Sequence, residues 1–330
     1  MLFLIAACLL ASAVTVISQF YYLTKTYGDD YIQKSDYASH RLIVNGSARA
    51  PYRYRILTDY VLAGVIHLAP GQMPEKYVTV SFIFRIFQNF FIFLAAYGFF
   101  RTLHFSRARS YLGLVLLAYG MCFAFYGTGL SFYIYTELLF FLVAIILINR
   151  GHDWLILPLT ILGALNREES VFIPIMLLLV RWSEERCKVT WANFFKIRYI
   201  QIFLASMLAY FLVYFGLRYV LGPAAYVGSR YGAIYPGLNL LLLNILNQKT
   251  WIGLLQMYNL TLLALLFIKK WPKRLMVWLF GMVLPWFGAQ FMFASTAETR
   301  LFLVPLALVF IPAVISLLDL NMPDNLPEIS

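Results

Sequence analysis

The apolar residues of this chain fall into repeated blocks of about 20 residues, separated by short polar stretches. A helix of about 20 residues crosses the ~30 Å hydrocarbon layer of a bilayer, and these blocks are continuous rather than alternating. The pattern predicts an all-α polytopic membrane protein with about ten transmembrane helices. The blocks are Leu2 to Leu23 and the segments near 78–100, 110–127, 132–149, 154–165, 171–181, 199–220, 250–268, 275–294 and 300–318.

The polar stretches predict two outer loops and two interfacial helices. Residues 24–55 form the first outer loop, and residues 54–69 have apolar positions at helical spacing, which is typical of a helix at the membrane interface. Residues 222–249 are rich in glycine, proline and tyrosine and predict a second outer loop with an amphipathic helix, Leu238 to Leu246. Residues 1–320 are expected to form one transmembrane domain, and 321–330 a cytoplasmic tail.

The first apolar block has two interpretations. Ala11-Ser12-Ala13 resembles the cleavage site of a signal peptide. However, the block has no basic residue before it and is long enough to span a membrane. We therefore interpret it as the first membrane helix.

Composition and charge agree with a membrane protein. Of the 330 residues, 62% are hydrophobic and 12% are charged, whereas roughly a quarter are charged in a soluble domain. The net charge of +11 would suggest nucleic acid in a soluble protein, but here cytoplasmic loops and lipid phosphates explain it, so no nucleic-acid partner is expected.

The basic residues predict the orientation. Of the 26, half lie in four short loops on one side, which should therefore be cytoplasmic. The opposing feature is the loop 24–55, which carries six basic residues on the other side. The residues of the four loops are Arg101, Arg107, Arg109, Arg150, Arg181, Arg186, Lys188, Lys196, Arg198, Lys269, Lys270, Lys273 and Arg274.

The segment from Trp154 to Trp182 is an apolar run broken by Asn166-Arg167-Glu168-Glu169-Ser170. Each flank has about 12 residues, or roughly 18 Å of helix, so two flanks can form a hairpin that does not reach the far surface. Ionised side chains at its tip cost at least ~2.5 kcal/mol each unless they pair or line a hydrated cavity. Arg167 can pair with a neighbouring glutamate to tolerate the turn, but three charges favour a functional site.

Arg85 lies deep in the second apolar block, and Gln88 follows on the same helix face. Together they can present a guanidinium and an amide to one cavity, and arginine suits a phosphate because its planar fork donates two parallel hydrogen bonds. The alternative is that Arg85 is the buried partner of a carboxylate. Glu137, in the fourth block, is the acid best placed for that role.

The first outer loop begins with an acidic pair, Asp29 and Asp30. Adjacent carboxylates repel each other, which raises one pKa and lets that group accept a proton near neutral pH. They can also share a divalent cation such as Mg²⁺ or Mn²⁺, or form a solvated turn.

The rest of this loop carries further polar and aromatic residues: Asp36, His40, Arg41, Tyr52, Arg53, Tyr54 and Arg55. The alternation of Arg53 and Arg55 with tyrosines fits contact with an interfacial phosphate, or anchoring in an aromatic belt. Glu298 and Arg300, where the chain enters its last apolar block, form either a helix-start pair or part of a site.

With these residues in place, the chain resembles the membrane glycosyltransferases of the GT-C superfamily, which take sugars from polyprenyl-phosphate carriers on the outer or lumenal membrane face. The resemblance covers the whole architecture, from an inward N-terminus through a long acidic first loop to a bundle of short-looped spans. The local matches are Gly28-Asp29-Asp30-Tyr31, Pro51-Tyr52-Arg53-Tyr54-Arg55, Asn166-Arg167-Glu168-Glu169-Ser170 and Glu298-Thr299-Arg300.

The resemblance implies roles for these residues. Asp29 or Asp30 would be the general base that deprotonates the acceptor hydroxyl. The arginines would bind the lipid phosphate: Arg53, Arg55, Arg85, Arg167 and Arg300. The remaining residues would orient them or contact sugar and acceptor: Gln88, Glu137, Asn166, Glu168, Glu169, Tyr231 and Glu298, with Tyr226 and Tyr235 as further stacking residues.

The implied partners are a polyprenyl-phosphate-linked sugar, membrane lipids and a glycan, lipid or protein acceptor. The expected location is a bacterial inner membrane with the site on the extracytoplasmic face. No cofactor is required, apart from Mg²⁺ or Mn²⁺ if the acidic pair binds a cation. The sequence contains neither GxxxxGK[ST] nor a strand followed by GxGxxG, so no soluble nucleotide site is expected.

Two other functions remain open at this stage. A polymerase or ligase of lipid-linked oligosaccharides also joins sugars from a polyprenyl carrier, but usually depends on a large later outer loop. A flippase or transporter would use the broken segment at 166–170 as a mid-membrane binding site and predicts a repeat of that segment, which the sequence does not display.

Overall fold

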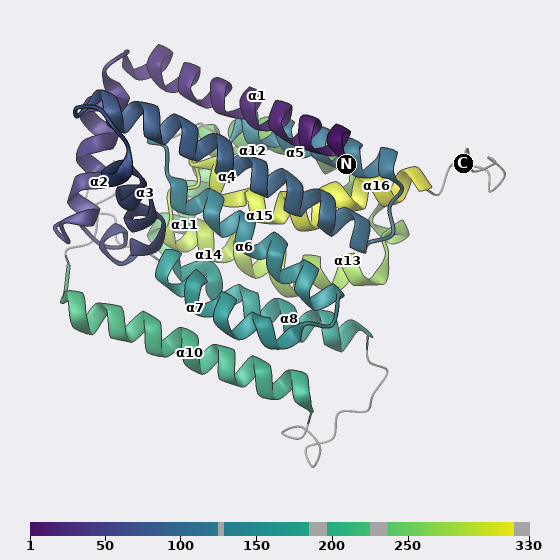
Figure 1. The fold of residues 1–330 in the computed structure, drawn as a ribbon. Helices are drawn as coiled ribbons and strands as arrows, with labels where there is room; N and C mark the ends of the chain where they lie inside the picture. Colours follow the sequence, from purple (N-terminus) through teal and green to yellow (C-terminus); the bar gives the residue numbers. More distant parts are fainter. Residues whose placement is uncertain (125–128, 185–196, 225–236, 320–330) are drawn as a thin grey trace.

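The computed structural model describes residues 1–124, 129–184, 197–224 and 237–319, and the elements in these ranges are helices (Figure 1). Within them, seven helical segments are long and apolar enough to cross a membrane. The chain is therefore an all-α integral membrane protein, as predicted. The segments are α1 (Leu2–Tyr27), α4 (Glu75–Thr102), α6 (Phe132–Asn149), α10 (Arg198–Leu221), α12 with η5 (Gln248–Lys270), α13 to α14 (Lys273–Phe293) and η7 to α16 (Thr299–Leu318).

Three further apolar blocks form shorter helices. These are α5 (Arg107–Phe123), α7 (Ile156–Asn166) and α8 (Phe172–Glu184), with 17, 11 and 13 residues. At 1.5 Å per residue they are roughly 16–26 Å long, less than the ~30 Å hydrocarbon layer. Each of the ten predicted blocks is thus helical over most of its described length, and seven of them have the length of a membrane span.

The helices pack as a bundle around the C-terminal segment. α1 lies along α4 and α5, and α4 lies along α6. The segment from Thr299 to Leu318 is the most buried of the seven and runs through the middle of the bundle in Figure 1. Aromatic side chains fill the core, for example Phe141, whose ring meets the ring of Trp286 edge-on at 5.3 Å. α10 lies at one edge, against α7 and α8.

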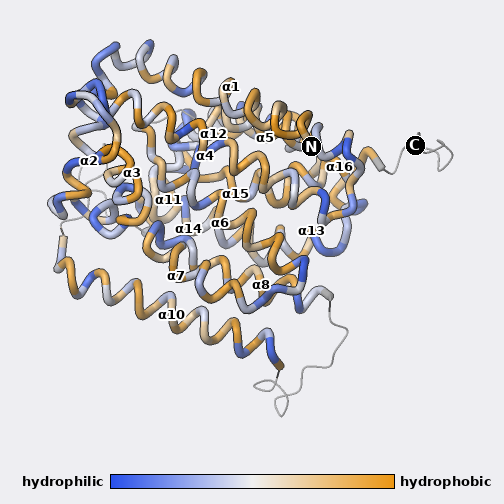
Figure 2. Tube along the Cα trace, viewed as in Figure 1, coloured by the Kyte–Doolittle hydropathy of each residue, from blue (hydrophilic) through white to orange (hydrophobic). Residues whose placement is uncertain are grey.

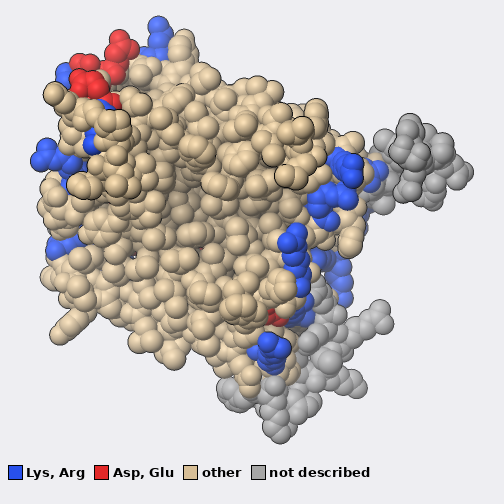
Figure 3. Space-filling model, viewed as in Figure 1, with Lys and Arg blue, Asp and Glu red and all other residues tan. Residues whose placement is uncertain are grey.

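Charged residues collect at the two ends of the bundle. Apolar residues follow the middle of the helices, and polar residues lie toward their ends (Figure 2). In Figure 3, lysines and arginines lie at both ends of the bundle, and a broad neutral belt separates the two ends. At the end that holds the N-terminus basic residues predominate, whereas most of the visible acidic residues lie at the other end, beside further basic ones. We call the first the basic end, formed by Met1 and the loops 103–106, 150–152 and 271–272, and the second the opposite end.

α7 and α8 form the predicted hairpin. Arg181, near the end of α8, donates from Nε to Oδ2 of Asp153, just before α7, at 2.9 Å, so both open ends of the hairpin meet at the basic end. Gly163 of α7 faces Ser170, and a Cβ added to this glycine would lie 2.7 Å from the serine Cβ. The tip between the helices contains the short helix η4 (Glu168–Val171).

The loop predicted over residues 24–55 includes short helices. It contains the π-helix η1 (Ile32–Asp36), α2 (Tyr37–Val44) and the 3₁₀ helix η2 (Tyr52–Tyr54). The predicted interfacial helix is α3 (Ile56–Leu68), and the predicted helix of the second loop is α11 (Leu238–Leu246). Tyr226, Tyr231, Tyr235 and the predicted tail at 321–330 lie outside the described residues.

Candidate functional site

A cavity of about 580 Å³ lies at the opposite end of the bundle. Its wall is built from η1, α2, α3 and the start of α4, together with residues 129–133 before and within α6 and one residue at the start of the last apolar segment. The charged and titratable groups that line it include Asp36, His40, Arg49, Asp59, Tyr77 and Arg300. The folded first loop therefore brings acidic and basic groups to one open cavity.

Asp36, the last residue of η1, is a buried carboxylate in this wall, with 9% of its surface exposed. Its Oδ1 accepts a hydrogen bond from the backbone N–H of Leu130 at 2.8 Å, and Oδ2 accepts one from the hydroxyl of Tyr77 at 2.8 Å. Burial raises the pKa of the Asp36 carboxyl above its ordinary value, although both hydrogen bonds and the charge of Arg85 act in the opposite direction. Both carboxylate oxygens are thus already engaged.

His40 and Asp59 form a second buried pair in the same wall. His40 lies on α2 and Asp59 on α3, and the imidazole Nδ1 is 2.8 Å from the carboxylate Oδ1. The side chains are only 7% and 8% exposed. The imidazole ring also lies against the ring of Tyr77, with centroids 5.4 Å apart. The carboxylate and the aromatic ring together fix the orientation of the imidazole.

Residues 129–131 lead into α6 beside the cavity, and side chains hold the backbone of Gly129 and Leu130. The carbonyl of Gly129 accepts from Nη1 of Arg300 at 2.8 Å, and the carbonyl of Leu130 accepts from Nη2 of Arg85. Gly129 has φ +83°, and a Cβ there would lie 2.8 Å from Oδ1 of Asp36. Only glycine fits both the left-handed backbone and the close carboxylate.

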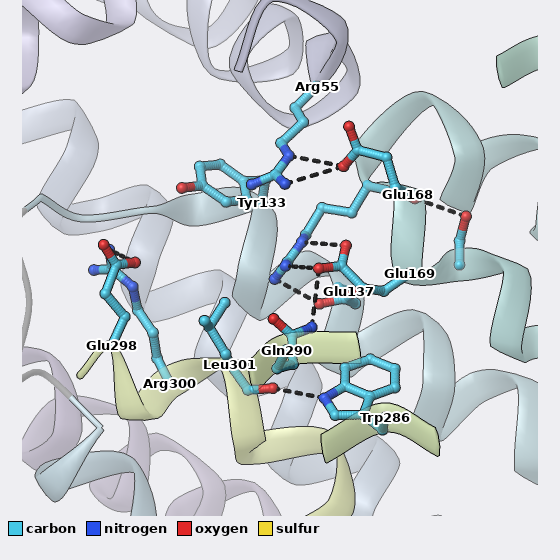
Figure 4. Close-up of polar contacts among 12 residues, drawn as sticks. Arg55, Tyr133, Glu137, Glu168, Glu169, Trp286, Gln290, Glu298, Arg300 and Leu301 are labelled. Carbon is cyan, nitrogen blue, oxygen red and sulfur yellow. Dashed lines mark hydrogen bonds and ion pairs between the residues drawn. The ribbon is translucent and has the colours of Figure 1, made fainter. Parts of the chain in front are cut away.

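A network of ion pairs surrounds the hairpin tip. The guanidinium of Arg167 is 1% exposed; its Nη1 lies 2.8 Å from Oε2 of Glu137, and its Nε donates to Oε2 of Glu169 at 3.0 Å. Gln290 of α14 (Leu284–Phe293) donates from Nε2 to Oε1 of Glu169 at 3.0 Å. The tip is thus fixed to α6 and α14 (Figure 4).

The same network reaches α3 and α10 through Glu168. Arg55, just before α3, donates from Nε to Oε2 of Glu168 at 3.0 Å, as Figure 4 shows. Arg218 of α10 approaches the other carboxylate oxygen at 3.4 Å, and the hydroxyl of Tyr210 donates to the Glu168 carbonyl at 2.8 Å. The edge helix α10 is therefore connected to the hairpin by polar contacts.

The charges of this network balance, because three arginines face three glutamates: Arg55, Arg167 and Arg218 with Glu137, Glu168 and Glu169. Desolvating an ion is expensive unless an opposite charge and hydrogen bonds compensate it. A phosphate could reach Arg55 or Arg167 only by displacing a carboxylate. The two glutamates of the tip therefore hold the arginines in position.

The irregular backbone of the tip is also satisfied. Asn166 donates from Nδ2 to the carbonyl of Tyr133 at 2.7 Å and accepts from the hydroxyl of Thr58 at 2.5 Å. The hydroxyl of Ser170 donates to the carbonyl of Arg167 at 2.8 Å. Asn166 therefore connects the tip to α3 and α6, and Ser170 satisfies a carbonyl of the turn itself.

Tyr133 lies between the cavity and the ion network. It lines the cavity beside Tyr52, whose ring centroid is 6.0 Å away, and the guanidinium carbon of Arg55 lies 5.1 Å from its own ring centroid. Figure 4 draws it between the pair of Arg55 and Glu168 and the pair of Arg300 and Glu298. The network thus supports one wall of the cavity from behind.

Arg85 and Gln88 share a helix face, as predicted, but they do not line the cavity. Arg85 is fully buried, and its Nη1 donates to Oε1 of Gln88 at 2.8 Å. The guanidinium carbon lies 4.0 Å from the ring centroid of Tyr135. Arg85 is not the partner of Glu137, which faces Arg167 instead. Arg85 and Gln88 act from behind the wall, on the backbone of residues 130 and 132.

Asp29 and Asp30 lie on the surface, outside the cavity lining. Asp30 pairs with Lys34 one turn later at 2.8 Å, with both side chains mostly exposed. A hard cation prefers several oxygen ligands, and the ammonium of Lys34 competes for one of these carboxylates. Among the described residues no three His, Cys, Asp or Glu side chains gather as a metal set.

The remaining predicted residues have separate positions. Arg53 binds the carbonyls of Leu221 and Pro223, so it holds the end of α10 rather than facing the cavity. Glu298 accepts from Nη2 of Arg300 at 2.8 Å, which places the predicted pair at the cavity edge. Tyr231, predicted to contact the sugar, lies outside the described residues.

Several cavity residues were not singled out from the sequence. Asp36 and His40 were recognised only as polar residues of the first loop, and Asp59 lies in the segment 54–69, which was interpreted only as an interfacial helix. Arg49 and Tyr77 gave no signal beyond their residue type. The available signal was a histidine and several carboxylates in a loop and a helix that were expected on the same side of the membrane. The sequence alone does not indicate that these side chains lie close together in space.

Comparison of the chain with protein-family models, with curated proteins and with solved structures found no match.

Proposed function

We propose that this chain is a membrane glycosyltransferase of the GT-C type, which transfers a sugar from a polyprenyl-phosphate carrier to an acceptor hydroxyl in the cavity. The observation that carries the proposal is the meeting of Asp36, His40, Asp59, Arg49 and Arg300 around one space of about 580 Å³. A cavity of that size is large enough for a sugar and a phosphate.

The chemistry requires few groups. The acceptor oxygen attacks the anomeric carbon, the bond from that carbon to the phosphate oxygen breaks, and the electron pair leaves with polyprenyl phosphate. Negative charge develops on the phosphate, and we assign to it Arg49 and Arg300, both in the lining. Arg300 would exchange its ion pair with Glu298 for the phosphate. The proton of the acceptor hydroxyl passes to a basic group of the cavity.

The proposal includes an arrangement in a bacterial inner membrane. All ten helical blocks would be embedded, with the α7-α8 hairpin entering from the cytoplasmic side. The basic end would face the cytoplasm, according to the positive-inside rule, and the cavity would open to the extracytoplasmic side. The acceptor would be a glycan, a lipid or a protein.

The test uses the full chain in proteoliposomes with a polyprenyl-phosphate-linked hexose and a panel of glycan, lipid and peptide acceptors. We expect release of polyprenyl phosphate together with a new glycosidic bond. Arg300→Gln should lower the rate by about 100-fold or more, because it removes charge stabilisation from the leaving phosphate. Lys34→Gln, which changes only the exposed pair with Asp30, is the matched control and should leave the rate unchanged.

Two outcomes would change the proposal. Movement of the lipid-linked sugar across the bilayer without a new glycosidic bond would identify a flippase instead. The variants Asp29→Asn and Asp30→Asn test whether the general base belongs to the acidic pair or to the cavity. Full activity in both single variants and in the double variant would agree with a base in the cavity, whereas loss of activity would return the base to the acidic pair.

A further inference from the structure

The imidazole of His40 lines the cavity and is paired with a carboxylate, and the transfer reaction needs a group that accepts a proton. Nδ1 lies 2.8 Å from Oδ1 of Asp59, and both side chains are more than nine-tenths buried. An ionised carboxylate accepts a hydrogen bond and cannot donate one, so the pair fixes the proton on Nδ1. The other ring nitrogen, Nε2, then carries a lone pair.

That second nitrogen is available to a bound molecule. His40 lines the cavity, and among the residues that the structure describes its only hydrogen-bond partner is Asp59. Asp36, another carboxylate of the lining, differs in this respect, because each of its oxygens already accepts one hydrogen bond, from Leu130 or Tyr77. Nε2 of His40 has no such partner among the described residues.

The surroundings of His40 suit an imidazole that gains a proton during the reaction. Asp59 from α3 and Asp36 from η1 can stabilise a developing imidazolium, while the cavity arginines are assigned to the phosphate. The charged and titratable groups around it are Asp36 of η1, Arg41 of its own helix, Arg49, Tyr52 of η2, Asp59 of α3, Tyr77 of α4 and Arg300.

We propose that His40, held by Asp59, is the proton acceptor of the transfer reaction, an inference that rests on the proposed glycosyltransferase function. As the acceptor oxygen forms its bond to the anomeric carbon, its proton moves to Nε2 of His40, and the electron pair of the breaking bond leaves with polyprenyl phosphate. The imidazolium then releases this proton to water. Asp59 is a positioning residue that keeps the imidazole in the correct tautomer.

The test measures transfer by the full chain in proteoliposomes across a range of pH. His40→Gln should lower the transfer rate by about 100-fold or more and leave the KM for the polyprenyl-phosphate-linked hexose unchanged. The wild-type rate should fall as the pH is lowered, because a protonated imidazole cannot accept a proton, and this acidic limb should vanish in His40→Gln. Added imidazole should partly restore transfer by a His40→Ala variant.

Matched variants separate the roles of the neighbours. Asp59→Asn offers an amide N–H to Nδ1 and so favours the wrong tautomer, which should lower the rate while KM stays constant. Asp36→Asn should retain the acidic limb. His67→Gln, which changes an exposed histidine of α3, is the control for substitution itself.

The outcomes distinguish this inference from the function on which it rests. If the wild-type chain forms no glycosidic bond with any acceptor, the proposed function fails and this inference fails with it. If the wild type transfers sugar and His40→Gln keeps both the rate and the acidic limb, only the assignment of His40 is overturned. Loss of the limb in Asp36→Asn but not in His40→Gln would assign the base to Asp36.

Discussion

Arg167 illustrates how far single residues can be interpreted from the sequence. A charge in an apolar run predicts a partner, and its neighbour Glu169 is indeed one. The other partner, Glu137, is 30 positions away along the sequence and belongs to a different helix. The cost of a buried charge can therefore be estimated from one sequence, but its partner depends on the packing of helices.

We predict that Arg167→Gln destabilises the protein by about 3–5 kcal/mol, because it leaves the carboxylate of Glu137, 3% exposed, without its counter-charge. Adding Glu137→Gln should recover part of this loss, since the buried charge is then removed as well. The measurement is the free energy of unfolding in detergent for both single variants and the double variant.

Arg218→Gln is the control within the same network. Its guanidinium is 27% exposed and 3.4 Å from Glu168, so the loss should be below about 1 kcal/mol. Additive losses from Arg167→Gln and Glu137→Gln would contradict the coupling of these two residues.

At the scale of elements, the hydrophobic pattern predicts helices well and their connections less well. The blocks at 2–23 and 132–149 correspond to α1 and α6, because continuous apolar runs have no other stable form in a bilayer. The segment 24–55 was predicted only as a loop, and no helix was assigned within it, whereas the structure contains η1 and α2 there. Its short polar helices owe their stability to contacts with α3 and α4, which no local pattern encodes.

The hairpin gives a prediction about packing between elements. Gly163→Ala should destabilise the protein by about 1–3 kcal/mol, because the new Cβ would lie 2.7 Å from Cβ of Ser170 and push the tip away from α7. Ser170 donates to the carbonyl of Arg167, so its displacement also disturbs the ion network. Thermal unfolding in detergent measures the effect.

Gly216→Ala in α10 is the matched substitution, because nothing lies within 4 Å of the position that its Cβ would occupy. It should leave stability unchanged or raise it by up to about 1 kcal/mol through helix propensity. Equal effects at both glycines would mean that the α7-α8 contact is looser than the structure indicates.

At the scale of the whole molecule, the distribution of basic residues is related to the position of the candidate site. The fold places the basic loops at one end and the cavity at the other, so Arg49 and Arg300 are separated from the residues that would set orientation. The sequence predicted this separation from loop charges alone. It did not predict the cavity, because Asp36, Asp59 and Arg300 converge only when the first loop folds over the start of α6.

The orientation of the bundle is the last prediction. In a chain whose three cysteines are replaced, Ser35→Cys at the opposite end should react with a membrane-impermeant maleimide added to intact cells, because Ser35 is exposed beside the cavity. His152→Cys, exposed in a loop of the basic end, should react only after the cells are permeabilised. The physical reason is that short loops rich in lysine and arginine remain in the cytoplasm. Labelling of His152→Cys in intact cells, with protection of Ser35→Cys, would put the cavity in the cytoplasm and remove the extracytoplasmic transfer reaction proposed for it.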